Sequence, residues 1–224
     1  MNIIEDGILL VDKQPGWTSF DVVAKIRGMR RAALKETGVV PTKRQLKVGH
    51  AGTLDPFATG LLIILLGDAT KRSDEFLKQD KIYEATIRLG QVSSTGDPEG
   101  ELTAVSSIQP TEVEIHAALE KFMGQITQTP PIYSAIKING QRAYKLARKG
   151  QVVEIPTRQV TIHSLDLLEY NYPNLKIRTH VSSGTYIRSL AQDIGEALGT
   201  GAYCSELRRI SIGKMTIDSV SAIL

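Results

Sequence analysis

An uninterrupted run of six apolar residues, Leu-Leu-Ile-Ile-Leu-Leu at 61–66, places the strongest limit on how this chain folds. The run is far shorter than the roughly 20 residues that cross a bilayer. Because it lacks the polar alternation of a half-exposed strand, it predicts a strand that is covered on both faces. Such a strand requires a substantial core, and a chain of 224 residues with 42% hydrophobic residues has the material for one.

The other patterns mix helices and strands without a regular alternation. Thr18 or Ser19 is placed to cap a helix, and Thr111 with Glu114 forms a capping-box pattern before another. The predicted helices cover about 21–34, 111–122, 142–149 and 185–198. The predicted strands cover about 7–12, 61–66, 81–89 and 132–138, and several more strands are predicted within 151–170 and 175–182. This order predicts an α+β fold and not a series of βαβ units.

The segment before the apolar run carries a candidate catalytic group. Asp55 lies between Gly52 and Gly60 and directly before Pro56. A proline disfavours helical geometry for the residue before it, and glycine lets the backbone approach a ligand closely. This pattern fits a nucleophile or general base held in a rigid loop. An Asp-Pro dipeptide is also common in ordinary turns, so a plain surface turn is the alternative.

Short motifs follow one another along nearly the whole chain, from about residue 7 to about residue 212. They occupy residues 7–19, 49–60, 67–71, 81–85, 130–137, 143–150, 183–188 and 207–209. In sequence and in order they resemble the motifs of the TruB family of tRNA pseudouridine synthases. The resemblance implies the pseudouridine synthase fold, which is a mixed but mostly antiparallel sheet with flanking helices and a central catalytic cleft.

The resemblance also implies a reaction, the conversion of uridine to pseudouridine in the T arm of tRNA at position 55. The bond between C1′ and N1 breaks, the uracil turns in place, and C5 joins the sugar. By resemblance, Asp55 is the nucleophile, Tyr83 stacks on the flipped base and suits acceptance of the C5 proton, and Arg188 pairs with the Asp55 carboxylate. Two routes stay open, attack on the base or elimination to a glycal. The ordinary alternatives are a core tyrosine and a water-exposed arginine at a helix start.

Five further residues gain candidate roles from the resemblance. His50 matches a histidine that contacts the extruded nucleotides, and Tyr186 and Leu207 match positions that line the pocket. Lys71 and Lys13 are candidates for phosphate contact. On general grounds, the histidine is also typical of polar surface, the tyrosine and leucine of packing, and the lysines of solvent-exposed positions.

Basic residues cluster in two segments, although the net charge is only +3. Segment 25–47 holds eight basic residues against Glu36, and segment 137–158 holds six against Glu154. Either cluster alone fits a solvated face, but two clusters beside the candidate catalytic segments favour binding of RNA phosphates. The expected partner is tRNA, through its T-arm stem-loop, and the protein is expected to be a monomer.

Two other functions fit parts of the sequence. A two-metal nuclease needs clustered ligands, whereas no carboxylate cluster stands out and the histidines are dispersed. These histidines are His50, His116, His163 and His180. A non-catalytic RNA-binding or tRNA-folding module would keep the fold without needing the catalytic set. Because neither a Walker loop nor a dinucleotide fingerprint is present, we expect no nucleotide cofactor, and we expect no metal.

The chain shows no internal repeat and no long linker, so 1–224 is expected to be a single catalytic domain, with 124–154 as an RNA-gripping insertion. Many family members carry a further C-terminal RNA-binding domain, which is not expected here. Segment 28–46 is longer than usual, and its basic residues are expected to supply some of that contact. The single cysteine and the acidic start of the chain favour the cytoplasm and give no sign of membrane insertion.

Overall fold

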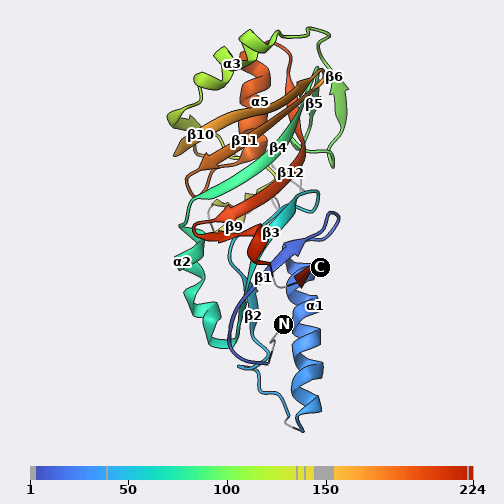
Figure 1. Cartoon of the computed structure of the whole chain (residues 1–224), viewed down its shortest axis with the longest axis vertical. Coiled ribbons are helices and arrows are strands. Elements are labelled where there is room, and N and C mark those ends of the chain that lie inside the picture. Colours follow the sequence, from blue (N-terminus) through green and yellow to red (C-terminus); the bar gives the residue numbers. More distant parts are fainter. Residues whose placement is uncertain are drawn as a thin grey trace. The chain divides into compact units, whose positions relative to one another are not determined.

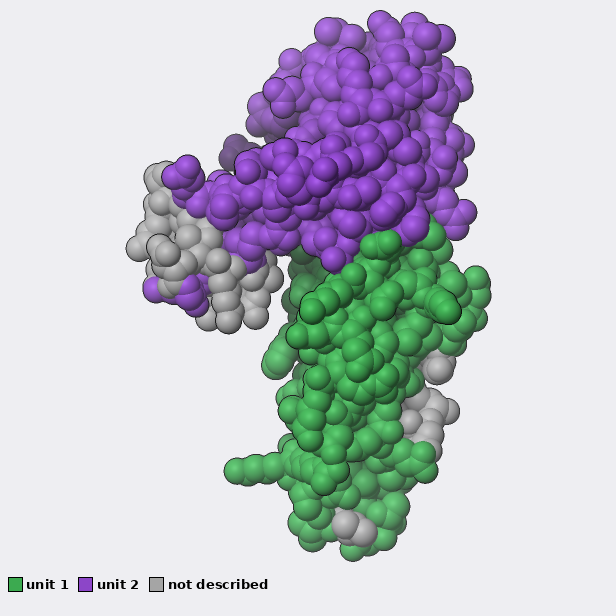
Figure 2. Space-filling model, turned by 90° about the vertical axis from the view of Figure 1, so that its left-hand side faces the viewer, with its two compact units in different colours: residues 1–83, 208–224 green, residues 84–207 purple. Residues whose placement is uncertain are grey.

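The computed structural model describes residues 4–38, 40–134, 136–138, 140–143, 154–220 and 222–223 of the chain. The chain divides into two compact units, which Figure 2 colours separately. Unit 1 comprises residues 1–83 and 208–224, and unit 2 comprises residues 84–207. Two strands, β4 (Lys81–Leu89) and β12 (Ala202–Ile212), begin in one unit and end in the other. The single catalytic domain expected from the sequence stays a prediction.

The apolar run forms the centre of unit 1 as strand β3 (Thr59–Leu66), and the six residues of the run are at most 2% exposed. This confirms the prediction of a strand covered on both faces. Strand β3 pairs antiparallel with β1 (Gly7–Lys13) and with β2 (Val48–His50), and its first residues pair in parallel with β12. Two short strands complete this part of the sheet: β13 (Met215–Thr216) pairs with β12 and β14 (Ala222–Ile223) with β1.

Helix α1 (Ser19–Glu36) lies beside β1 and β2 in Figure 1 and confirms the helix predicted over 21–34. It begins at a capping box in which the Thr18 hydroxyl accepts a hydrogen bond from the Asp21 amide and the Asp21 carboxylate accepts one from the Thr18 amide. Its apolar face is buried in unit 1. The remaining helical segments of this unit are η1 (Gly67–Arg72), α2 (Ser73–Leu77) and η2 (Ile217–Ser219).

Unit 2 is built on β10 (Arg158–Asn171), which pairs antiparallel with β11 (Asn174–Val181) and with β7 (Gly124–Gln128). The order of strands in this unit is β12, β4, β11, β10, β7. Two short hairpins stand apart from this order. They are β5 (Gln91–Ser93) with β6 (Leu102–Ala104) and β8 (Lys137–Ile138) with β9 (Gln141–Arg142).

Two helices of unit 2 begin near their predicted positions. Helix α3 (Glu112–Glu120) starts at the predicted capping box of Thr111 and Glu114. Helix α5 (Ile187–Ala197) buries Leu190 and Ile194, and Figure 1 shows it behind β10 and β11. Mixed and mostly antiparallel pairing with flanking helices confirms the predicted α+β class.

Three local predictions need comment. The ranges 151–170 and 175–182 were predicted to hold several strands, and their described part holds two, β10 over 158–171 and β11 over 174–181, with two register shifts in their pairing, at 162–164 and 167–169. Of the strand predicted over 132–138, residues 137–138 belong to β8, and the described residues 132–134 and 136 lie outside any strand. The basic helix predicted over 142–149 lies almost wholly outside the described residues. Among the described helices, none has the length and apolar character needed to span a membrane.

Candidate functional site

The loop between β2 and β3, residues 51–58, presents Asp55 and is called the Asp55 loop below. At its start the Ala51 amide donates to the Ile63 carbonyl at 2.9 Å. Inside the loop the Ala58 amide donates to the Asp55 carbonyl at 3.1 Å and closes a turn. Asp55 is half-buried. The carboxylate therefore stands in a closed turn between two paired strands.

The first residue of α1 fixes the backbone next to Asp55. The Ser19 side chain is buried, and its hydroxyl accepts a hydrogen bond from the Leu54 amide at 2.8 Å and donates one to the Leu54 carbonyl at 3.0 Å. Both polar backbone groups of a buried residue are thus satisfied by one side chain from another element. The N-terminus of α1 is in this way attached to the Asp55 loop.

Arg209 on β12 holds the start of the same loop. Its guanidinium is buried and donates to the carbonyl oxygens of Leu61 at 2.7 Å, Gly52 at 3.0 Å and Thr53 at 3.4 Å. A planar guanidinium with five donors suits three acceptors that lie in different directions. Gly60 allows this close packing, because its φ is +99° and a Cβ there would lie 2.3 Å from the Arg209 carbonyl oxygen.

Lys13 corrects one prediction. Its side chain is fully buried, and its ammonium donates to the carbonyl oxygens of Gln14 at 3.0 Å, Trp17 at 2.7 Å and Pro56 at 3.1 Å. An ammonium enclosed by carbonyls is not presented to a phosphate, so the phosphate contact expected from the sequence is wrong. Lys13 instead ties the Asp55 loop to the end of β1.

The other candidates of unit 1 lie at separate places in the fold. His50 is the last residue of β2, directly before the Asp55 loop, and is half-buried. Tyr83 is 7% exposed and shares the buried face of β4. Lys71 is exposed and pairs with Asp68 at 3.1 Å, and its hydrogen bond lowers the pKa of the Asp68 carboxyl. The roles of these residues toward RNA stay predictions.

Lys81 is a buried cation on the same face of β4 as Tyr83. Its ammonium donates to the carbonyl oxygens of Leu77, at 3.1 Å, and Gln79. Burial lowers the pKa of Lys81 from 10.5 to about 8, and the charge of Arg209 adds to this effect. The strand face that carries Tyr83 therefore also carries an amine that titrates near pH 8.

Arg188 lies in unit 2 as the second residue of α5 and is only 4% exposed. Its Nη1 donates to the Thr95 carbonyl at 2.9 Å and to the Asp97 carboxylate at 2.8 Å, and its Nη2 donates to the Tyr133 carbonyl at 2.7 Å. The alternative of a water-exposed arginine at a helix start is therefore wrong. The pairing of Arg188 with Asp55 stays a prediction.

Sequence reasoning missed Asp97, the buried carboxylate that pairs with Arg188. Its Oδ1 also accepts hydrogen bonds from the Thr95 hydroxyl at 2.5 Å and from the Glu99 amide at 3.1 Å. A signal was present, because this residue precedes a proline and lies between two glycines, as Asp55 does. The bonds from three donors hold a negative charge beside a guanidinium inside unit 2.

Tyr186 and Leu207 also lie in unit 2. Tyr186 is half-buried at the N-cap of α5, and the guanidinium carbon of Arg158 lies 5.3 Å from its ring centroid. The side-chain amide of Gln128 accepts from the Tyr186 amide at 2.8 Å and donates to its carbonyl at 3.0 Å. Leu207 is 8% exposed on β12. Because packing alone explains both burials, the pocket-lining roles stay predictions.

The histidines are less dispersed in space than in sequence. His163 on β10 and His180 on β11 have ring centroids 4.7 Å apart, because the two strands pair antiparallel. The separation along the chain concealed this contact. For this pair it corrects the expectation, drawn from their spacing in the sequence, that the histidines are dispersed.

Comparison with known families decides the relationship of this chain. A model described as TruB family pseudouridylate synthase (N terminal domain) matches residues 40–187. A second, described as tRNA pseudouridylate synthase B C-terminal domain, matches residues 188–223. The chain belongs to the TruB family. This confirms the resemblance found in the sequence motifs.

Individual TruB proteins match over most of this chain. The tRNA pseudouridine synthase B of Cupriavidus pinatubonensis is 46% identical over 215 residues, which is 95% of this chain and 64% of that protein. The tRNA pseudouridine synthase B of Parabacteroides distasonis is 47% identical over 219 residues, which is 97% of this chain and 90% of that protein. The chain thus spans slightly less than two thirds of the first relative and most of the second.

Solved structures confirm the TruB fold. The match to a structure titled as a Cbf5-Nop10-Gar1 complex has a TM-score of 0.71 at 30% identity, and it covers 98% of this chain and 53% of the other. A structure of an H/ACA RNP bound to a substrate RNA containing 2′-deoxyuridine gives a TM-score of 0.69 at 28% identity, and it covers 98% and 52%. The pseudouridine synthase fold expected from the sequence is therefore confirmed.

Proposed function

We propose that this TruB-family chain converts uridine to pseudouridine in the T arm of tRNA, at position 55. In this proposal Asp55 is the nucleophile, Tyr83 stacks on the flipped base and accepts the C5 proton, and Arg188 keeps the nucleophile ionised. The observation that carries the proposal is the immobilised Asp55 loop. Side chains from three separate elements, Lys13, Ser19 and Arg209, bind its backbone.

A fixed loop suits this chemistry. Holding a carboxylate in position before the substrate arrives removes much of the entropy cost of bringing two reacting groups together. A carboxylate is a weak nucleophile in water and gains reactivity where a closed pocket excludes water. The three clamps described above bind backbone groups of the loop and so fix the position of Asp55.

The proposed reaction balances without a co-reactant. The bond from N1 to C1′ breaks, the bond from C5 to C1′ forms, C5 gives up a proton and N1 gains one. No electrons are exchanged, so residues of the chain and the RNA suffice. The uracil must leave its stack to reach the carboxylate, at a cost of about a few kcal/mol. Stacking on an aromatic ring such as Tyr83 is the usual compensation.

The test is incubation of purified protein with an unmodified tRNA transcript and no added cofactor. Pseudouridine is then mapped by reverse-transcription stops that depend on carbodiimide treatment. We expect one stop, in the T loop, and we expect Asp55→Asn to abolish it. Asp74→Asn is the matched control, since Asp74 is exposed in the first turn of α2.

Each other outcome has a definite meaning. A stop elsewhere in the tRNA contradicts the T-arm specificity but not the reaction. Full product formation by Asp55→Asn contradicts the role of Asp55 as the nucleophile. Tight tRNA binding with no product from the wild type favours a non-catalytic RNA-binding or tRNA-folding module. The monomeric state and the cytoplasmic location stay predictions.

A further inference from the structure

The solvent side of α1 carries a row of cations, called the α1 strip below. Lys25, Arg31 and Lys35 are exposed, and Arg27 beside them is half-buried. The sequence has no acidic residue between positions 22 and 35. Within the described part of the chain, none of the three exposed cations forms an ion pair. These three cations therefore face water without an ion-pair partner among the described residues.

Small residues alternate with these cations. Ala24, Gly28 and Ala32 are exposed and follow one another at the four-residue spacing of one helix face. A Cβ added at Gly28 would meet no atom within 4 Å. A polyanion can approach the helix backbone closely along this row while lysine and arginine side chains reach it from both sides.

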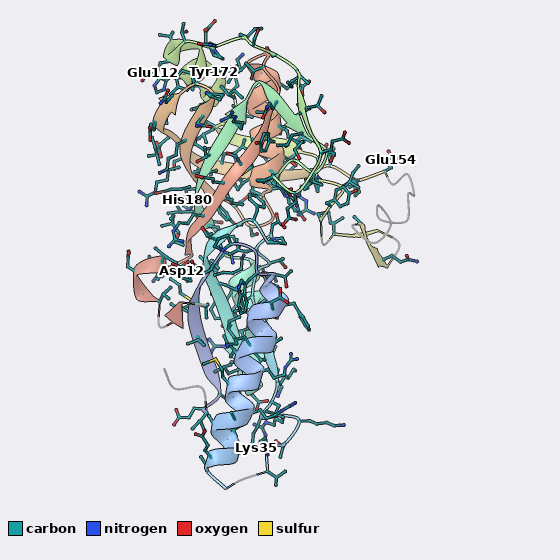
Figure 3. All side chains as sticks on the ribbon, turned by 90° about the vertical axis from the view of Figure 1, so that its right-hand side faces the viewer. Asp12, Lys35, Glu112, Glu154, Tyr172 and His180 are labelled. Carbon is teal, nitrogen blue, oxygen red and sulfur yellow. The ribbon has the colours of Figure 1, made fainter. Side chains whose placement is uncertain are left out.

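The helix that carries the strip starts at the candidate catalytic site. Ser19, the first residue of α1, binds Leu54 in the Asp55 loop. From there the helix runs for 18 residues, and Lys35 lies near its far end, as labelled in Figure 3. At 1.5 Å per residue, Lys35 is about 24 Å along the axis from Ser19. The cations therefore lead away from the loop that carries Asp55.

We infer that the α1 strip binds the phosphate backbone of the RNA stem next to the loop that carries the target uridine. The inference rests on the proposed function, because it takes the RNA as positioned by its target base at Asp55. Lysine and arginine are the usual phosphate ligands, and their contacts position an RNA without reading its sequence. Double-stranded RNA is recognised mainly through its shape and backbone, which suits a smooth cationic helix.

Two other cations of the basic segment are less available. Arg30 is fully buried, where it binds the Asp6 carboxylate and the Glu5 carbonyl. Arg44 shares Asp68 with a neighbouring lysine. The sequence-based expectation that the basic residues of 28–46 contact RNA therefore does not hold for Arg30, and for the others it stays a prediction. Deleting 30–44 would remove part of the core of unit 1 and would not test RNA contact.

A membrane is the main alternative partner for a basic amphipathic helix. Such a helix inserts its apolar face between lipid head groups. The apolar face of α1 is not available, since Val22, Val23, Ile26 and Leu34 are at most 4% exposed within unit 1. On α1, Phe20 is the one large hydrophobic side chain that is exposed, at 64%. The chemistry of the strip therefore favours phosphates of RNA.

The test uses a triple variant, Lys25→Gln, Arg31→Gln and Lys35→Gln. Glutamine has nearly the helix propensity of lysine and arginine, so α1 should stay intact. The control is Lys78→Gln, Lys121→Gln and Lys214→Gln, which removes the same charge from exposed sites elsewhere. Binding is measured across a salt series with two hairpins that share the T loop, one with a short stem and one with about ten base pairs.

We expect the α1 triple variant to bind the long-stem hairpin about tenfold to a hundredfold more weakly near 0.1 M salt, with a salt slope reduced by roughly two. Binding of the short-stem hairpin and its conversion to pseudouridine should change little. The control variant should keep the wild-type slope. These results would support the inference.

Equal affinity and equal salt slope for wild type and the α1 variant would overturn the inference. So would binding of phosphatidylserine vesicles that depends on the strip while RNA binding does not. A wild type that binds the hairpins but makes no pseudouridine would contradict the proposed function instead. In that case the salt series with the short-stem and long-stem hairpins still tests whether the α1 strip binds the RNA stem.

Discussion

Replacing Ser19 by alanine should disturb the candidate site without touching any group that meets RNA. The hydroxyl makes two hydrogen bonds, of 2.8 and 3.0 Å, to the amide and carbonyl of Leu54. Ser19 is 2% exposed and Leu54 is 3% exposed. In the alanine variant both backbone groups of Leu54 stay buried and lose their partner.

The magnitude follows from these contacts. A buried polar group left without a partner costs about 1–3 kcal/mol, so two groups on one residue should cost about 2–6 kcal/mol. That is a large share of the roughly 5–15 kcal/mol by which a folded protein is stable. Because Asp55 directly follows Leu54, relaxation of the loop should also displace the carboxylate. A displacement of about 1 Å costs on the order of a hundredfold in rate.

Two measurements separate the effects. Urea unfolding followed by circular dichroism gives the free energy of unfolding, and tritium release from tRNA labelled at uridine C5 gives kcat and KM. We expect lower stability and a kcat reduced by about ten- to a hundredfold, with KM nearly unchanged. Ser205→Ala is the control, since Ser205 makes one hydrogen bond, to the Thr86 carbonyl at 3.0 Å in unit 2. It should lose about 1 kcal/mol and keep kcat.

The reasoning is refuted if Ser19→Ala has wild-type stability and wild-type kcat. A loss of stability with an unchanged kcat would mean that the two bonds hold the fold but do not set the position of Asp55. Rates must be taken well below the unfolding temperature of the variant. A lower population of folded protein then does not imitate a slower reaction.

Three further predictions rest on single contacts. Asp97→Asn should destabilise the fold by about 3–5 kcal/mol in urea unfolding, because it removes the buried negative charge that pairs with the Arg188 guanidinium, and a loss below 1 kcal/mol would contradict this. The pKa of Lys81 is lowered from 10.5 to about 8, so the unfolded chain binds more protons in that window and stability rises with pH. Relative to Lys81→Met, the free energy of unfolding of the wild type should rise by up to about 3 kcal/mol between the two pKa values. Parallel profiles of unfolding free energy against pH for the two proteins would refute the pKa shift. Gly60→Ala should lower Tm by at least about 5 °C in calorimetry, whereas Gly28→Ala in open helix should not lower it.

The sequence predicted those parts of the fold that depend on neighbouring residues. The apolar run at 61–66, the helix cap at Thr18 or Ser19 and the capping box at Thr111 each use contacts within four residues, and all three appear where expected, the cap being Thr18. The β-branched residues of 151–170 and 175–182 indicated strands, but they do not show where strand β10 begins and ends. Its two register shifts depend on the pairing with β11, which no local pattern reveals.

The candidate site shows the same division. Glycine and proline around Asp55 indicated a rigid loop, since they act on their own backbone. The residues that make it rigid were not found. Ser19 lies 35 positions from Leu54, and Arg209 lies 157 positions from Gly52. Serine and arginine at such distances have no local signature, and only the fold shows that their side chains point inward.

Buried cations change how the charge of this protein should be counted. Arg30, Arg209 and Lys13 are the three largest of its fully buried side chains, and each donates to backbone carbonyls. Their number equals the whole net charge of +3. The excess of positive charge is therefore no measure of attraction for RNA, because cations that hold the fold contribute to it.

What remains for RNA is the placement of the exposed charges. If net charge governed binding, the control variant at Lys78, Lys121 and Lys214 would weaken it as much as the variant of the α1 strip, because both remove three charges. If the placement of charges governs binding, only the strip variant should lower the salt slope. The slope depends on the number of phosphates that the protein contacts and not on its total charge. The two salt slopes therefore decide between a general attraction and a surface built along one helix.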